Sequence, residues 1–335
     1  MRRPTLSTAM ISLLSGALLF GNPGAQAQNG APAARDPNAV PPVQGQNVNG
    51  MHVYIRSGLK SHGEGAHDYP QFLSDWSKVL TDHGAVVDGS FHAPMAQELA
   101  HTDVLVIYKG DAGYMTAEEK AALEAYVRRG GGIVTIHDAL CGPDPVYFAS
   151  LVGGAKKHTE RNSAAGRLTY TVTDTASPIM KGVPQNFTFD DEAFFLMTWS
   201  QNPQIHVLAT VAIPAGRGGA PGANPAAARG PAPNAAAAQP PNGPPAGQSH
   251  AGEVVPQIWT YEHTLAGGQP ARAFVYMQGH TFENFSNPVI RDMLLRGIAW
   301  AGKHPVDELA AYNPPPEQAG RGGRGGRGAP AAAPN

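Results

Sequence analysis

The chain has 335 residues, a formal net charge of -2 and a single cysteine, Cys141. The nearly balanced charge excludes a general electrostatic attraction to nucleic acid or to an acidic membrane surface. A single cysteine excludes an intramolecular disulfide, so a buried core has to stabilise the fold.

Residues 1–27 have the pattern of a cleavable signal peptide. Arg2 and Arg3 precede the apolar run Met10–Phe20, and Ala25-Gln26-Ala27 is an A-x-A cleavage signal. The apolar run is too short to serve as a permanent membrane span. We therefore expect a periplasmic or secreted protein without a stable membrane anchor.

Three further segments have low complexity: 28–46, 214–252 and 313–335, the last of which is rich in Gly, Arg, Pro and Ala. Their few apolar side chains cannot offset the entropy lost on ordering, so we expect them to be disordered. The remaining residues, 47–312, are predicted to form one α/β domain that is interrupted by the insertion 214–252.

The first half of this domain alternates between predicted strands and helices. Strands are expected at 52–56, 86–87, 104–108 and 133–136. One helix ends at His83-Gly84, and the next begins with a capping box formed by Thr116 and Glu119. This alternation predicts a mostly parallel sheet with helices on both faces.

The second half has a looser pattern. Short apolar or alternating segments predict strands at 168–172, 187–192, 206–211, 257–261 and 273–277, and a short helix at Pro145–Val152. The segments 206–211 and 257–261 flank the insertion and are expected to pair. Asn287-Pro288 is a typical helix start, with an N-cap followed by proline.

Titratable residues gather on predicted loops and at strand ends: His67, His137, His158, His280, Asp191 and Glu192. His137 follows a buried strand directly, where open α/β sheets place their sites. Imidazoles with a carboxylate suit zinc and similar divalent ions. There is no HExxH motif, so the fold would have to bring these side chains together. The alternative interpretation is that each histidine is an ordinary polar loop residue.

Cys141 and the glycines at 130–132 are interpreted as structural features. Cys141 lies beyond the strand end, and the sharp turn where a nucleophile would be presented is occupied by His137. A buried structural thiol is the preferred interpretation of Cys141. The glycines at 130–132 precede a strand instead of following one, so they indicate helix termination and no nucleotide cofactor.

The arrangement of several segments resembles the ThuA-like family, named for a trehalose-utilisation protein. The resemblance covers most of 51–302 and depends on the His67-Asp68 loop, the run Tyr126–Ala139 (YVRRGGGIVTIHDA), Leu151-Val152-Gly153-Gly154 with His158, Ser177-Pro178-Ile179, Asp191-Glu192, His206-Val207-Leu208-Ala209, Gly279-His280 and Gly297-Ile298-Ala299-Trp300-Ala301. The insertion 214–252 departs from the family pattern.

The resemblance implies a flavodoxin-like α/β fold, related to class I glutamine amidotransferase domains. Those domains carry a cysteine nucleophile at the elbow where this chain has His137, so cysteine-dependent glutamine hydrolysis is not expected. The family also implies a role in sugar pathways, often beside oxidoreductases that make keto-sugars.

We therefore predict a carbohydrate-utilisation protein with a small-molecule sugar ligand, such as trehalose or a 3-keto-glycoside. The predicted catalytic residues are His137 and Glu192. The predicted metal ligands are His67, His137, His158 and His280, with zinc as the preferred ion. The predicted substrate contacts are His67, Asp68, Asp138 and Asp191, of which Asp191 would also orient a histidine.

Two alternatives stay open at this point. The chain could be a sugar-binding or accessory module without turnover, in which the same pocket only donates and accepts hydrogen bonds. A hydrolase that uses Asp191 and Glu192 as paired carboxylates ranks lowest, because adjacent strand residues point to opposite faces. Whether the chain catalyses a lyase, hydrolase or isomerase step, and whether it forms homo-oligomers, is not determined by the sequence.

Overall fold

The computed structural model describes residues 49–157, 162–202, 204–214 and 250–313. The strands in these residues are β1 (His52–Ser57), β2 (Val86–Ser90), β3 (Val104–Tyr108), β4 (Gly132–Ile136), β5 (Cys141–Gly142), β6 (Gly154–Lys157), β7 (Ser163–Val172), β8 (Asn186–Phe194), β9 (Thr198–Trp199), β10 (Ile205–Ala212), β11 (Val254–Thr264) and β12 (Pro270–Tyr276). The helices are α1 (Tyr69–Asp82), α2 (Ala96–Leu99), α3 (Ala117–Arg128), α4 (Pro145–Val152) and α5 (Pro288–Ala301).

The main sheet of the described residues has nine strands in the order β2-β1-β3-β4-β12-β11-β10-β7-β8. The first five pair in parallel. From β12 onwards every pairing is antiparallel. Strand β12 therefore joins a parallel half to an antiparallel half, and its carboxyl end lies next to that of β4.

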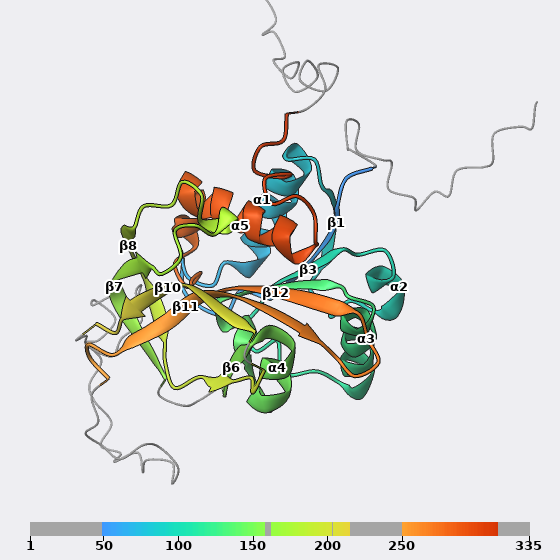
Figure 1. Ribbon diagram of the computed structural model, residues 1–335, viewed down its shortest axis with the longest axis horizontal. Helices are drawn as coiled ribbons and strands as arrows, with labels where there is room; N and C mark the ends of the chain where they lie inside the picture. Colours follow the sequence, from blue (N-terminus) through green and yellow to red (C-terminus); the bar gives the residue numbers. More distant parts are fainter. Residues whose placement is uncertain (1–48, 158–161, 203, 215–249, 314–335) are drawn as a thin grey trace, which may run out of the picture. The chain divides into compact units, whose positions relative to one another are not determined.

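Helices cover both faces of the sheet (Figure 1). On one face α1 and α5 bury Phe72, Trp76 and Leu294 against the strands. On the other face α3 and α4 bury Leu123 and Phe148. The predicted α/β class with helices on both faces is confirmed by this layering.

The local signals of the sequence form the expected contacts. The Thr116 hydroxyl accepts from the Glu119 amide and the Glu119 carboxylate accepts from the Thr116 amide, which closes the predicted capping box at the start of α3. Asn287 caps α5 through the Val289 amide. The predicted pairing across the insertion is also confirmed, because β10 pairs with β11.

The antiparallel half is drawn together by a buried amide. Gln257 of β11 is fully buried, donates to the Phe194 carbonyl of β8 at 2.7 Å and accepts from the Phe194 amide at 3.2 Å. The two strands are not neighbours in the sheet order. This bridge therefore brings the end of β8 back towards the junction with the parallel half.

Some features of the fold have no counterpart in the predicted elements. Helix α2 and the small three-stranded sheet β5-β6-β9 were not expected.

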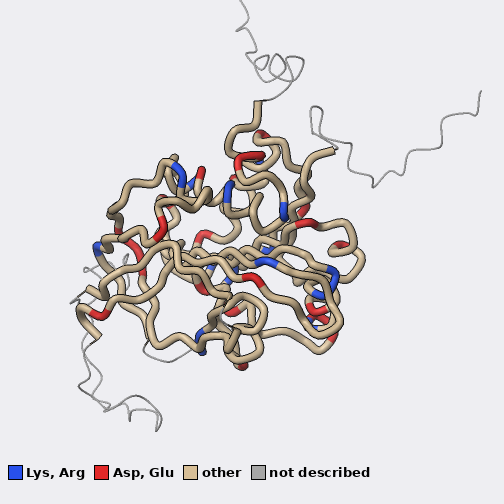
Figure 2. Tube along the Cα trace, viewed as in Figure 1, with Lys and Arg blue, Asp and Glu red and all other residues tan. Residues whose placement is uncertain are grey.

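The predicted signal peptide and the linker that follows it lie outside the described residues, as do nearly all of the insertion and the tail. Among the described residues no helix is long and apolar enough to cross a membrane. Acidic and basic residues are scattered along the described chain trace (Figure 2).

A buried histidine on β11 has no polar partner among the described residues. Both ring nitrogens of His263 are shielded from solvent without a hydrogen bond, and its ring stacks on Tyr261 with the centroids 4.6 Å apart. Burial lowers the pKa of His263 to about 4. The folded chain therefore holds this imidazole in its neutral form at neutral pH.

His263 should make the fold sensitive to mild acid. The unfolded chain takes up this proton near pH 6.5 and the folded chain only near pH 4, so stability falls as the pH drops through that window. We expect a loss of about 1–2 kcal/mol between pH 7 and pH 5, smaller in His263→Phe. Urea unfolding at both pH values measures it. An unchanged pH dependence in His263→Phe contradicts the prediction, and the exposed His101→Phe is the control.

Candidate functional site

The site begins where β4 ends. The chain turns sharply at His137, whose φ of 54° lies in the left-handed region. This conformation costs a residue with a β-carbon on the order of 1 kcal/mol or more. The imidazole is fully buried, and its Nδ1 lies 3.0 Å from the Met277 carbonyl. Because a carbonyl only accepts, Nδ1 carries the proton and Nε2 presents its lone pair.

His67 reaches the same point from the loop after β1. Its φ is 48°, and its amide donates to the His280 carbonyl at 3.0 Å, which fixes the loop against the end of β12. Its Nε2 lies 2.9 Å from Nε2 of His137. Two neutral imidazoles can form a hydrogen bond of this length if Nε2–H of His67 donates to the Nε2 lone pair of His137. Burial first, and the neighbouring His137 second, lower the pKa of His67 to about 2, so it is neutral at neutral pH.

His280 follows β12 and is held by Asp191 of β8. The Asp191 carboxylate accepts from the amides of Gly279 and His280, the latter at 3.0 Å, and from Nδ2 of Asn284 at 2.7 Å. Asp191 is fully buried. Burial raises its pKa, although the hydrogen bonds favour the ionised form. The backbone position of His280 therefore depends on this carboxylate.

Glu192 points to the opposite side of β8, towards the histidines. Its Oε2 lies 3.3 Å from Nδ1 of His280 and 3.6 Å from Nε2 of His137. Burial opposes its ionisation, but the hydrogen bond with His280 and the electrostatic interaction with His137 outweigh burial and lower its pKa to about 2. Its side chain is 15% exposed, so the carboxylate can be reached from solvent.

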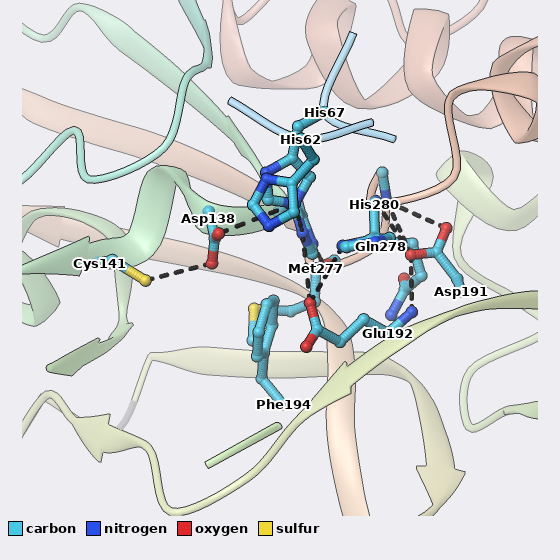
Figure 3. A network of polar contacts seen from close by, with 12 residues as sticks. His62, His67, Asp138, Cys141, Asp191, Glu192, Phe194, Met277, Gln278 and His280 are labelled. Carbon is cyan, nitrogen blue, oxygen red and sulfur yellow. Dashed lines mark hydrogen bonds and ion pairs between the residues drawn. The ribbon is translucent and has the colours of Figure 1, made fainter. Parts of the chain in front are cut away.

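Together these four side chains form a compact donor set, which we call the histidine cluster: His67, His137, Glu192 and His280. One ligand atom from each lies within 4.8 Å of all the others. Figure 3 shows Glu192 and His280 facing each other and His67 beside them. Nitrogens bound to one zinc ion lie about 3 Å apart or slightly more, close to the His67–His137 separation. The cluster could therefore hold a metal ion of the zinc type.

Asp138 borders the cluster on the side of β6. Its Oδ2 lies 3.9 Å from Nε2 of His67, and its Oδ1 lies 3.3 Å from Nζ of Lys156. Burial opposes its charge, but the electrostatic interactions with His137 and Lys156 outweigh burial and lower the pKa of Asp138. Lys156 also packs over the Phe194 ring, with Nζ 3.5 Å from the centroid. At 17% side-chain exposure, Asp138 presents a charged acceptor at the edge of the cluster.

Cys141 does not present a nucleophile. Its sulfur is buried and donates to Oδ1 of Asp138 at 3.3 Å. Burial and then the nearby Asp138 charge raise the pKa of the thiol far above its ordinary value. The thiol therefore stays protonated at neutral pH, as expected for a structural residue.

The structure places the predicted site residues in three groups. His67, His137, Glu192 and His280 meet, while Asp138 and Asp191 adjoin them. Asp68 forms an ion pair with Lys60 in the loop before α1 and is not one of the four residues that meet in the described part of the chain. His158 lies outside the described residues. Since Asp191 is fully buried, we assign it the orienting role instead of substrate contact.

Two residues at the site were not singled out from the sequence. His62 covers the cluster, with its ring centroid 3.8 Å from that of His67 and 5.4 Å from that of His280. Lys156 is buried beside Asp138. The position of Lys156 in the short segment Gly154–Lys157, directly after an apolar helix, was the available signal for a buried charge.

The family is established by comparison with known proteins. The family model described as ThuA, trehalose utilisation, matches residues 60–301, which is more than half of the chain. The chain therefore belongs to the ThuA family, as the resemblance of its segments indicated. No curated protein matches the chain significantly.

Two solved structures are similar to this chain. A ThuA-like protein from Bacteroides uniformis is 19% identical, covers 78% of this chain and 94% of its own, and superposes with a TM-score of 0.50. A ThuA-like protein from Parabacteroides merdae is 18% identical, covers 76% and 90%, and has a TM-score of 0.49. At 19% identity, the likeness to the Bacteroides uniformis protein concerns the fold and not the activity.

Replacing Asp191 by asparagine should loosen the site. The amide nitrogen would face backbone N–H donors, so we expect a loss of about 2 kcal/mol in stability and a change in the environment of His280. Thermal unfolding and the imidazole NMR resonances of His280 measure these effects. Asp190→Asn is the matched control, because Asp190 is exposed and its carboxylate forms an ion pair with Arg167 at 3.1 Å. Equal behaviour of both variants would refute the assigned role.

Proposed function

We propose that this ThuA-family protein acts on a small carbohydrate and uses a divalent metal ion, with zinc preferred. One observation carries the proposal: three imidazoles and one carboxylate have ligand atoms within 4.8 Å of one another in the described part of the chain. Three protein ligands with a free position is the usual arrangement of a catalytic zinc site. His67, His137 and His280 fit the ligand role, which leaves Glu192 as the group that handles a proton.

The donor set passes a chemical test for such an ion. His137 donates from Nδ1 to the Met277 carbonyl, so its Nε2 lone pair is directed into the cluster. His67 is neutral at neutral pH because burial lowers its pKa to about 2. Both features match what a metal requires of histidine ligands. A divalent ion held there would supply a Lewis acid that polarises a carbonyl or hydroxyl oxygen.

The surrounding residues suit an oxidised glycoside as substrate. A carbonyl at the 3-position of a sugar ring acidifies the neighbouring C–H, and a nearby ionised carboxylate can accept that proton. Glu192 is ionised and 15% exposed, so it is the candidate base. Asp138 can accept hydrogen bonds from sugar hydroxyls at the edge of the cluster. Cleavage or isomerisation of a 3-keto-glycoside is the reaction class we propose.

A non-catalytic sugar-binding role is the second candidate. The contact between His67 and His137 at 2.9 Å satisfies both ring nitrogens without any metal. In that case the cluster would be a hydrogen-bonding surface for hydroxyl groups. Assays with 3-keto-glycosides separate the two: turnover that is lost in Glu192→Gln favours the enzyme, and tight sugar binding without turnover favours the binding module.

We also propose that the protein is exported. The support is the signal-peptide pattern of residues 1–27, which lie outside the described residues. Mass spectrometry of the protein from its native host should find a mature N-terminus near Gln28. An intact Met1 in the mature protein would argue against export.

Metal content tests the leading proposal. The purified chain should contain about one equivalent of metal, which chelators remove. The double variant His137→Ala with His280→Ala should retain less than about a tenth of it, because two of the three imidazoles are lost. Elemental analysis by mass spectrometry provides the measurement. The control is the double variant His206→Ala with His101→Ala, which removes two exposed histidines and should keep the metal. A metal-free protein that binds sugars tightly would favour the second candidate.

A further inference from the structure

The histidine cluster has little contact with solvent. His67 and His280 are each 2% exposed, and His137 is fully buried. Glu192 is the most exposed member, and only 15% of its side chain is accessible. A sugar that approaches from solvent therefore cannot reach the three imidazoles directly. A covering group has to move aside before such a ligand can enter.

His62 is a covering group on the solvent side of the cluster. It belongs to the segment 59–65, in which every residue is exposed. Its ring nevertheless lies over two of the imidazoles, with its centroid 3.8 Å from that of His67 and 5.4 Å from that of His280. Figure 3 shows the rings of His62 and His67 next to each other. The backbone of His62 is thus in solvent while its side chain faces the cluster.

The electrostatic surroundings of His62 agree with this orientation. Burial first, and the neighbouring His280 second, lower the pKa of His62, while Asp138 and Glu192 act in the opposite direction. Such interactions weaken with distance, so the ring lies near all three side chains. It lies over the part of the cluster where the carboxylates of the site are accessible.

The loop that carries His62 is fixed at its end and loosely packed at its tip. At the end, the Phe282 amide donates to the Gly65 carbonyl at 2.9 Å, and the His67 amide donates to the His280 carbonyl at 3.0 Å. At the tip, a β-carbon added to Gly63 would meet no atom within 4 Å. Glycine also gives the backbone more conformational freedom than other residues. The tip can therefore move while the end stays in place.

The contacts that hold the tip over the cluster are exposed or local. Nζ of Lys60 donates to the Gly63 carbonyl at 2.6 Å and forms an ion pair with Asp68. The Lys60 side chain is 35% exposed, and exposed ion pairs stabilise weakly. The Ser61 hydroxyl lies 3.1 Å from Nδ1 of His62 and 3.2 Å from Nδ1 of His67. Few contacts therefore have to break when the tip moves.

We propose that His62 is the gate of the histidine cluster. Its imidazole closes the solvent side, and a movement of residues 59–64 uncovers His67 and His280 so that a small sugar can enter. The role in sugar entry rests on the proposed function, whereas the cover and its movement do not. His62 thus controls access to the cluster and is distinct from the residues that would hold an ion or move a proton.

Diethyl pyrocarbonate tests the gate, because it modifies neutral imidazoles that solvent reaches. The full chain is first treated with a chelator, so the result depends on neither a metal nor a sugar. Tandem mass spectrometry gives the rate at each histidine. His67 and His280 should react at least about tenfold more slowly than the exposed His101, because they react only when the tip has moved. Equal rates at the three histidines would overturn the proposal.

Two variants change the gate in opposite directions. His62→Ala removes the cover and should raise the rates at His67 and His280 by about tenfold. Gly63→Ala adds a methyl group in open space, at a residue without a positive φ, and stiffens the tip, so both rates should fall about threefold. His101→Ala is the control and should leave them unchanged. Rates equal to those of the wild type in either gate variant would overturn the proposal.

Turnover of a 3-keto-glycoside tests the proposed function separately from the gate. A chain without turnover, in which the His67 rate responds to both gate variants, would retain the gate and lose the proposed reaction. A chain with turnover, in which the His67 rate responds to neither variant, would retain the reaction and lose the gate.

Discussion

The structure of the site depends on the buried carboxylate of Asp191. It lies on β8, at the far edge of the antiparallel half, yet it accepts the backbone amides that follow β12, at the junction with the parallel half. An ionised group without solvent contact persists only when several donors surround it. Asp191 has them from Gly279, His280 and Asn284. The Asp191 carboxylate therefore ties β8 to the chain after β12, and in doing so it fixes the position of His280, a candidate metal ligand.

Successive side chains of a strand point to opposite faces, so the adjacent residues Asp191 and Glu192 have different roles. Asp191 faces the chain that follows β12, and Glu192 faces the histidines. Gln257 supports the arrangement from β11, because it binds both backbone groups of Phe194, two residues beyond Glu192. Glu192 is therefore positioned by Asp191 and Gln257, two buried residues that do not contact a ligand themselves. Strand β8 is fixed on both sides of Glu192, at Asp191 and at Phe194.

Local signals predicted much of the fold and part of the site. The capping box at Thr116, the N-cap at Asn287 and the buried runs of β3 and β4 depend on neighbours in sequence, and these predictions are confirmed. His137 could be located because a buried parallel strand ends directly before it. The curvature that brings β8 to β12 depends on contacts between residues such as Gln257 and Phe194, which lie 63 positions apart. No periodicity reports such contacts, and Lys156 was missed for the same reason.

The left-handed backbone conformation of His67 and His137 predicts which residue types relatives of this chain should carry at these two positions. At His67 and His137 the backbone adopts φ values that glycine would accept at lower cost. Selection for stability alone would favour glycine at both positions. A lineage that no longer needs the imidazoles should therefore drift to glycine there, while one that uses them should keep histidine despite the strain. The residue types found at these two positions across many relatives would separate working members of the family from those that retain only its fold.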